Sequence, residues 1–225
     1  MSEIILMIET STECCSVALA DGAQILASRI NETPRQQSSM LAPYIQDVLA
    51  ACGMTAGRLD AVAVSEGPGS YTGLRVGVST AKGICFGAGK PLLGIDTLQI
   101  LAMQAESRFD RIIAMIDARR MEVYAAPFDA GGHKLGETRA VILDENSYRE
   151  ELEAGTVLFI GTGVEKFQRI CPHPNAIFRE CPPLATEMVR PALSALQKKE
   201  FKDVAYFEPF YLKEFVAGIS RKSVL

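Results

Sequence analysis

Short apolar runs separated by polar turns open the chain, and they predict three strands in a meander. The first run covers residues 4–8, a polar turn follows at residues 9–13, and a second run covers residues 14–20. Asp21 and Gly22 form a dipeptide that is typical of a hairpin turn. Residues 24–30 are therefore expected to be the third strand, paired with the second.

Helical spacing replaces strand spacing in the next segment. Its apolar residues fall on one helix face: Leu41, Tyr44, Ile45, Val48, Leu49 and Cys52. Gly53 is a natural stop for this helix. Because proline cannot donate a backbone hydrogen bond, Pro43 means that the helix either starts near Ser39 or bends at Pro43.

Two further strand–helix pairs complete the first half. A strand over residues 61–65 is followed by a Gly-rich turn and a helix over residues 71–87, with Ser70 as its expected N-cap. A strand over residues 91–95 leads to a third helix, capped by Asp96 and expected to run to about residue 106.

The same plan starts again after residue 110. The pattern predicts strands over residues 111–116, 121–128, 138–143 and 157–160, then a short helix, a Pro-rich stretch, a helix over residues 184–197 and an extended tail over residues 206–213. A duplicated plan with a shortened second copy predicts a two-lobed α/β protein. We expect lobes at residues 1–106 and 107–225 that pack directly, since no low-complexity linker separates them.

Composition narrows the class of protein. Hydrophobic residues make up 48% and charged residues 22% of the 225 residues, which is ordinary for a globular chain. The net charge of −4 lacks the basic excess that proteins binding nucleic acid alone usually show. No signal-peptide pattern and no apolar run of membrane-spanning length are seen, and the six cysteines form no C-x-x-C pair. A cytoplasmic protein with reduced cysteines and no membrane contact is expected.

Two polar loops are candidates for weak phosphate binding. Thr10, Ser11 and Thr12 lie between the first two strands, and Gly67, Gly69 and Ser70 lie between a strand and a helix. A hairpin or a helix N-terminus with free N–H groups suits an anion. The P-loop signature and the G-x-G-x-x-G fingerprint are both missing. An ordinary polar hairpin and a tight docking turn therefore remain the structural alternatives.

Small residues recur every four positions in the following helix, at Gly73, Gly77 and Ala81. Each interior glycine costs roughly 0.5–1 kcal/mol relative to alanine, so close packing must compensate. That packing is either internal, against the sheet, or a contact with another subunit. No nucleophile motif is present, and Cys171, His173 and Cys181 lack a fourth ligand, so neither catalysis nor a metal site is expected.

Four blocks of sequence resemble one known family. They are Ile8-Glu9-Thr10-Ser11-Thr12, the run from Gly67 to Gly77, the run from Ile116 to Tyr124, and Pro209-Phe210-Tyr211-Leu212-Lys213. Together they cover essentially the whole chain in order, and they resemble the TsaB (YeaZ) family. The resemblance implies an actin-like, sugar-kinase-like fold of the ATPase superfamily.

The resemblance also implies a function in bacterial tRNA modification. A TsaB-type protein is a non-catalytic subunit that binds and activates TsaD, the enzyme that transfers a threonylcarbamoyl group to adenosine in tRNA. TsaE acts in the same pathway and joins the assembled complex. The resemblance implies that tRNA is reached only through the complex. We expect no cofactor, with weak nucleotide binding left open, and a homodimer when the chain is alone.

The Gly-rich helix and the first helix are the partner-binding elements that the resemblance implies. Carried over, the residues are Tyr71, Thr72, Gly73, Leu74, Arg75, Gly77, Val78, Lys82, Gln37, Leu41 and Tyr44. Gln37 departs from the family, in which this position is often histidine. TsaD-type enzymes carry an H-x-x-x-H metal pair where this chain has Thr97 and Leu101. Two alternatives stay open: a nucleotide-binding phosphotransferase or ATPase of the same fold, and a homodimeric scaffold with another partner.

Overall fold

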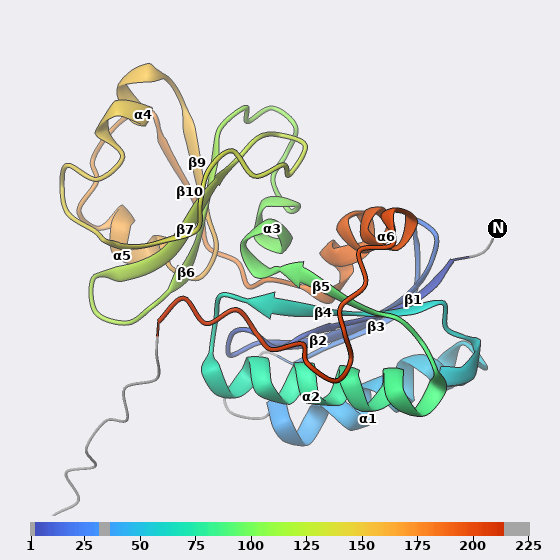
Figure 1. The fold of residues 1–225 in the computed structure, drawn as a ribbon. Coiled ribbons are helices and arrows are strands. Elements are labelled where there is room, and N and C mark those ends of the chain that lie inside the picture. The colour runs from blue at the N-terminus through green and yellow to red at the C-terminus, as the bar shows by residue number, and fades with distance from the viewer. Residues whose placement is uncertain (1–2, 32–36, 214–225) are drawn as a thin grey trace, which may run out of the picture.

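Two five-stranded sheets, one in each lobe, carry the fold of the computed structural model (Figure 1). The structure describes residues 3–31 and 37–213, without the side chains of residues 37 and 38. The strands of the first sheet are β1 (Ile4–Glu9), β2 (Cys15–Asp21), β3 (Gln24–Asn31), β4 (Ala61–Gly67) and β5 (Leu92–Asp96). Their order is β3-β2-β1-β4-β5, with β2 antiparallel to its neighbours and β4 parallel to both β1 and β5.

The second sheet repeats this topology. Its strands are β6 (Ile112–Asp117), β7 (Glu122–Phe128), β8 (Arg139–Ile142), β9 (Val157–Ile160) and β10 (Ala176–Arg179). The order β10-β9-β6-β7-β8, read from its other edge, matches the first sheet strand for strand. The predicted duplication is therefore confirmed. Strand β10 was missed because it is only four residues long and carries no clear alternation.

Helices cover the first sheet on both faces. One face carries α1 (Gln37–Ala51) and α2 (Tyr71–Ala88), and the other carries the 3₁₀ helix η2 (Ala185–Met188) and α6 (Val189–Lys198) (Figure 1). Strand β1 is buried along its whole length for this reason. Ile4, Leu6 and Ile8 pack toward α1 and α2, while Ile5 and Met7 pack toward α6.

The remaining helices are short. A 3₁₀ turn, η1 (Ala56–Arg58), precedes β4; α3 (Thr97–Ala102) lies between the sheets; α4 (Arg149–Ala154) and α5 (Val164–Gln168) belong to the second lobe. The second copy is shorter than the first mainly because its helices α4 and α5 are short. Helix α4 was not expected from the sequence.

Three helix boundaries differ from the sequence-based expectations. Helix α1 begins at Gln37, before Ser39, and Pro43 lies inside it. Helix α3 ends at Ala102 because the amides of residues 104 and 105 bond three residues back, in turns. The last predicted helix divides into η2 and α6. The caps are confirmed: Ser70 accepts a hydrogen bond from the Gly73 amide, and Asp96 accepts from the amides of residues 98 and 99.

The chain returns to the first lobe after β10. Helix α6 and η2 pack on the first sheet through Ala185, Met188, Val189, Ala192 and Ala195. A division at residue 106 assigns these residues to the second lobe by sequence, whereas in space they cover the first sheet. That division stays a prediction about separable units.

Residues 202–213 form an extended strap that leaves α6 and runs beside β5 and α2 toward the second lobe (Figure 1). The strap begins where the Lys202 amide donates a 2.9 Å hydrogen bond to Leu92 O at the edge of the first sheet. The expected extended tail is therefore confirmed. None of the helices in the described part of the chain combines the length and the apolar character needed to cross a bilayer.

Candidate functional site

The polar hairpin after β1 and the Gly-rich turn after β4 pack directly against each other. The Ser70 amide donates a 2.6 Å hydrogen bond to Ser11 O. A Cβ added at Gly69 would collide with that same carbonyl oxygen. Glycine is required at position 69 because the two backbones approach too closely for a side chain.

The structure thus brings together the two loops that were candidates for weak phosphate binding, but as a closed turn. The Ser11 amide donates to Glu9 Oε1 at 2.5 Å, and the Thr10 amide donates to Ser65 Oγ at 3.4 Å. Residues 10–12 are buried, with at most 9% of any one exposed. A phosphate reaching these amides would have to displace Ser70 and its turn, so the docking-turn alternative describes this loop.

Glu9 is a fully buried carboxyl group at the end of β1. Burial raises the pKa of Glu9 to about 7, against the smaller lowering effect of hydrogen bonds from Ser11 and Ser65. Glu9 Oε2 has no hydrogen-bond partner in the described part of the chain. The pKa of the Cys15 thiol rises to about 11, first through burial and then through the negative charge of Glu9.

A row of polar side chains crosses the first sheet at this level. On one side, Glu9 pairs with Ser16 of β2. On the other side, Ile8 pairs with Val64 of β4, so the residues that follow them, Glu9 and Ser65, also lie side by side. All three point to the face that α6 covers, because they continue the alternation of Met7, Ala18 and Ala63. Ser16 Oγ accepts a 2.9 Å hydrogen bond from the Ala185 amide. Through Ser16, the row anchors η2 on the first sheet.

The inner face of α2 packs inside the lobe. Gly73 meets the backbone of Thr10, and Gly77 meets its side chain, closely enough that an added Cβ would collide at either position. Leu74 and Val78 are also buried. Direct partner contact by these four residues is therefore corrected to internal packing, which answers the question left open for the small-residue repeat.

The outer face of α2 is exposed and has a different character. Five of its exposed residues recur at three- and four-residue spacing: Thr72, Arg75, Ser79, Gly83 and Phe86. We call this row the α2 stripe. Phe86 is 86% exposed, and a Cβ added at Gly83 would meet no atom within 4 Å. Small residues at the centre of the stripe leave room for the close approach of another helix.

The other predicted partner contacts have mixed positions. On α1, Leu41 is buried in the core, so it too is corrected to internal packing, whereas Tyr44 is partly exposed and donates a hydrogen bond to Ile30 O. The side chain of Gln37 lies outside the described residues. On α2, Lys82 is half-buried, and its Nζ donates to the carbonyl oxygens of residues 205 and 207 at 3.1 and 3.0 Å.

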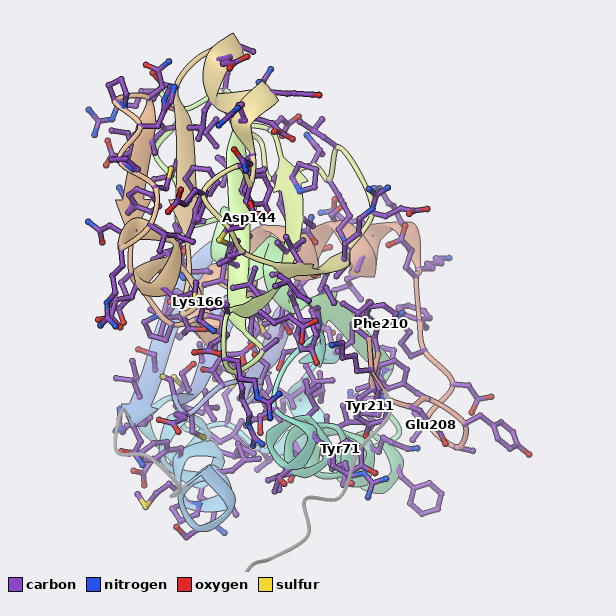
Figure 2. All side chains as sticks on the ribbon, turned by 90° about the vertical axis from the view of Figure 1, so that its left-hand side faces the viewer. Tyr71, Asp144, Lys166, Glu208, Phe210 and Tyr211 are labelled. Carbon is purple, nitrogen blue, oxygen red and sulfur yellow. The ribbon has the colours of Figure 1, made fainter. Side chains whose placement is uncertain are left out.

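The strap contacts were not foreseen from the sequence. Tyr211 lies against Tyr71, with ring centroids 4.9 Å apart, and its hydroxyl accepts a 3.3 Å hydrogen bond from Arg75 Nε. Figure 2 shows Tyr211 beside Tyr71, with Phe210 farther from Tyr71 along the strap. The only sequence signal for this packing was the aromatic character of the tail, which does not identify its partners.

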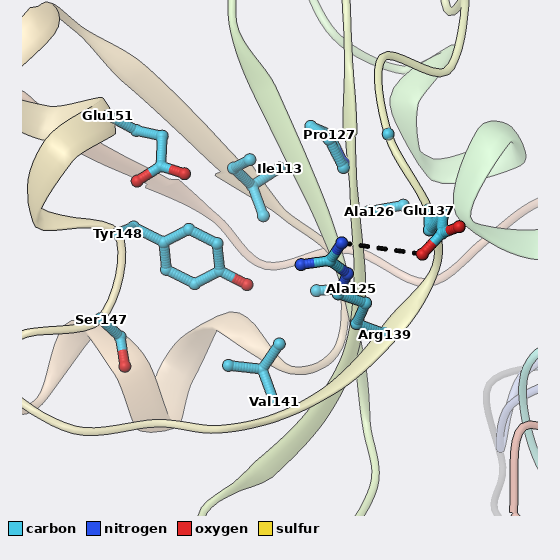
Figure 3. A pocket seen from close by; sticks show the side chains of 11 residues that line it. Ile113, Ala125, Ala126, Pro127, Glu137, Arg139, Val141, Ser147, Tyr148 and Glu151 are labelled. Carbon is cyan, nitrogen blue, oxygen red and sulfur yellow. Dashed lines mark ion pairs between the residues drawn. The ribbon is translucent and has the colours of Figure 1, made fainter.

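No metal centre is assembled within residues 3–31 and 37–213, where no three His, Cys, Asp or Glu side chains are grouped to hold an ion. Thr97 and Leu101 are both fully buried in α3, and neither offers an imidazole. The second lobe has an open hollow of about 380 Å³ between β7, β8 and the segment before α4 (Figure 3). Its walls include Tyr148 and Arg139 but none of the residues predicted to be functional.

The chain is similar in sequence to proteins of tRNA threonylcarbamoyladenosine biosynthesis. The chain matches the family model described as "TsaD: tRNA N6-adenosine threonylcarbamoyltransferase" over residues 24–220. The tRNA threonylcarbamoyladenosine biosynthesis protein TsaB of Escherichia coli K12 is 32% identical over 222 residues, which cover 95% of this chain and 96% of that protein.

Solved structures share the two-lobed fold. YeaZ from Pseudomonas aeruginosa aligns with a TM-score of 0.83 at 30% identity, over 93% of this chain and 100% of that one. The activator of 2-hydroxyisocaproyl-CoA dehydratase from Clostridium difficile, solved with bound ADPNP, aligns with a TM-score of 0.50 at 11% identity, over 90% and 99% of the two chains. The second likeness concerns the fold alone. The expected actin-like, sugar-kinase-like fold is confirmed, and the chain belongs to the TsaB (YeaZ) family of tRNA threonylcarbamoyladenosine biosynthesis proteins.

Proposed function

We propose that this chain is a non-catalytic subunit that binds and activates a TsaD-type threonylcarbamoyltransferase. The observation that carries the proposal is the α2 stripe, which exposes Phe86 and an unobstructed Gly83 on a helix whose other face is buried. An exposed aromatic residue beside small residues suits a partner helix at short distance. This chain then activates the TsaD-type subunit by ordering it.

Two further observations support an accessory function. At the positions where TsaD-type enzymes carry metal-binding histidines, Thr97 and Leu101 provide no imidazole to hold a transition metal. The hairpin at residues 9–12 is closed by the Ser70 turn, so its amides do not form an open phosphate cradle. The closed hairpin disfavours the alternative of a phosphotransferase or ATPase.

The remaining partners are part of the same proposal. Without a TsaD-type subunit, two copies of this chain bury the stripe against each other as a homodimer. TsaE joins only the assembled complex, and tRNA is reached through the complex, in keeping with the net charge of −4.

The test is a Gly83→Leu variant mixed with the cognate TsaD-type subunit. Leucine fits at position 83 without strain in the monomer, and it blocks close approach of a partner helix. We expect the wild type to co-elute with the partner and to support threonylcarbamoyl transfer to tRNA, and the folded variant to lose both. Light scattering should show a dimeric wild type and a monomeric variant.

The matched control is Gln168→Leu, which places an exposed leucine on α5 of the second lobe. This control should bind and support transfer like the wild type. Full binding by Gly83→Leu would show that the stripe is not the partner surface. Transfer by the partner alone, at the same rate, would show that this chain is not an activator.

A further inference from the structure

The strap touches the first lobe at successive points along its length. Lys202 forms a 2.8 Å ion pair with Glu66, and the Phe210 amide donates a 2.7 Å hydrogen bond to Glu66 O. Between these points, Lys82 of α2 donates to two strap carbonyl oxygens. A Cβ added at Gly67 would lie 2.5 Å from Phe210 O, so the strap is seated closely on the end of β4.

The end of this seated stretch is fixed by an aromatic and cationic cluster. The guanidinium carbon of Arg75 lies 4.1 Å from the centroid of the Tyr71 ring, while Arg75 Nε bonds to the Tyr211 hydroxyl. Packing of the two tyrosine rings, tilted at 41° to each other, adds a third contact. Tyr71 and Arg75 lie one turn apart on the same face of α2, and both hold Tyr211.

Two residues later, the strap reaches the other lobe. Lys213 Nζ contacts both carboxylate oxygens of Glu122, at 2.5 and 2.6 Å. Glu122 begins β7 and is itself held, because its carbonyl oxygen accepts a hydrogen bond from Lys166 Nζ at 3.0 Å. The ion pair therefore joins the end of the strap to β7 of the second lobe.

Besides the segment after β10, in which the chain returns to the first lobe, the lobes are joined by α3. This helix places Leu98 and Leu101 in the core of the second lobe and Ile100 in the core of the first. Figure 1 shows α3 between the two sheets, and the end of the strap below the second lobe near the β6–β7 side. Helix α3 is thus placed to act as a pivot, with the strap as a second attachment away from it.

We propose that the strap is a tie that holds the second lobe at a fixed angle to the first, with Tyr211 anchored on α2 and Lys213 anchored on β7. Only Leu212 separates Tyr211 from Lys213, so the Cα atoms of these two residues can be at most about 7 Å apart. Rotation of the second lobe about α3 that carries Glu122 beyond the reach of the Lys213 side chain must therefore break one anchor.

Residual dipolar couplings of the deuterated full chain test the tie without any partner. In the wild type, amides of the two sheets should fit one alignment tensor. In Lys213→Ala and in Tyr211→Ala, the alignment of the second sheet should fall relative to that of the first, because the lobes reorient. Lys213→Arg should keep a single tensor. The control Arg169→Ala removes an exposed ion pair between Glu165 of α5 and the C-cap residue Arg169, and it should behave like the wild type.

Amide exchange at Phe210 gives an independent measurement. Its hydrogen bond to Glu66 O should open more often when Tyr211 is replaced by alanine, so its exchange should accelerate while exchange within β1 stays unchanged. If all variants keep one tensor and the Phe210 amide exchanges at the wild-type rate in Tyr211→Ala, the tie is wrong.

A link from the tie to the partner follows, and this step rests on the proposed function. Arg75 belongs both to the α2 stripe and to the anchor of the strap, so a partner on the stripe contacts the tie. We expect Lys213→Ala to weaken binding of the TsaD-type subunit, whereas Arg169→Ala should not. Loosened lobes with wild-type affinity would disprove the link. Failure of the proposed function would instead appear as full binding by Gly83→Leu, and the dipolar couplings test the tie independently of both.

Discussion

Thr10, which follows β1, and Gly73 of α2 are in direct contact, so the end of β1 and the start of α2 pack as one unit. Thr10 Oγ1 donates a 2.8 Å hydrogen bond to Gly73 O, and any Cβ at position 73 would collide with Thr10 O. The first turn of α2 therefore rests on the end of β1. This contact determines how the Gly-rich helix lies on the sheet, and hence which of its residues face outward.

Replacing Gly73 with alanine should destabilise the protein by about 1–3 kcal/mol, because the colliding atom is backbone and cannot rotate away. Gly83→Ala is the matched control on the same helix. Its new methyl group meets no atom within 4 Å, so it should stabilise by about 0.5–1 kcal/mol through helix propensity. Urea denaturation of both variants measures the difference. Equal stabilities would contradict the close contact with Thr10.

The buried carboxyl group of Glu9 makes stability depend on pH. Its pKa is raised from 4.5 to about 7 by burial, so the folded state binds a proton that the unfolded state releases between these values. The contribution of this group to stability is complete below pH 4.5 and is lost as the pH rises through 7. At about 1.4 kcal/mol per pKa unit, the loss is about 3 kcal/mol.

Glu9→Gln should remove this dependence, since the amide stays neutral at every pH. We expect the variant to be as stable as the wild type near pH 5 and more stable near pH 8, as measured by urea denaturation at both values. Glu13→Gln, an exposed position on the same hairpin, serves as control and should keep the wild-type slope. A wild-type slope in Glu9→Gln would mean that another group is responsible.

Local signals made much of the fold predictable from the sequence. Ser70 and Asp96 were identified as caps because a cap needs only a side-chain oxygen and the next few amides. The duplicated sheet followed from repeated apolar runs and turns. Strand β10 and helix α4 were missed because such short elements are stabilised by tertiary contacts and have little pattern of their own.

The sequence could not show which residues of α2 face the sheet and which face outward. Leu74 and Arg75 are adjacent in one motif, yet Leu74 is fully buried and Arg75 is exposed. The resemblance carried over the whole block without indicating which residues face the sheet. The strap was harder still, since Arg75 and Tyr211 are 136 residues apart and no local pattern joins them.

The turn between β6 and β7 contains two arginines in a backbone conformation that disfavours side chains. Arg119 has φ of 72° and Arg120 has φ of 50°, in the left-handed region. The turn is held in place by its surroundings: the Arg119 amide donates to Asp117 Oδ1 at 2.5 Å, and Lys166 Nζ donates to Arg120 O at 2.7 Å. These contacts offset the unfavourable conformation.

Arg120→Gly should relieve that conformation, whereas Arg120→Ala keeps a Cβ and should not. The left-handed conformation destabilises a residue that has a Cβ by roughly 1–2 kcal/mol. Glycine avoids this cost but also increases the entropy of the unfolded chain, which offsets part of the stabilisation. We therefore expect the glycine variant to be more stable than the alanine variant by about 1 kcal/mol in urea denaturation. Both variants lose the same guanidinium, so the comparison isolates the backbone. Equal stability of the two would mean that the fold holds this turn without strain.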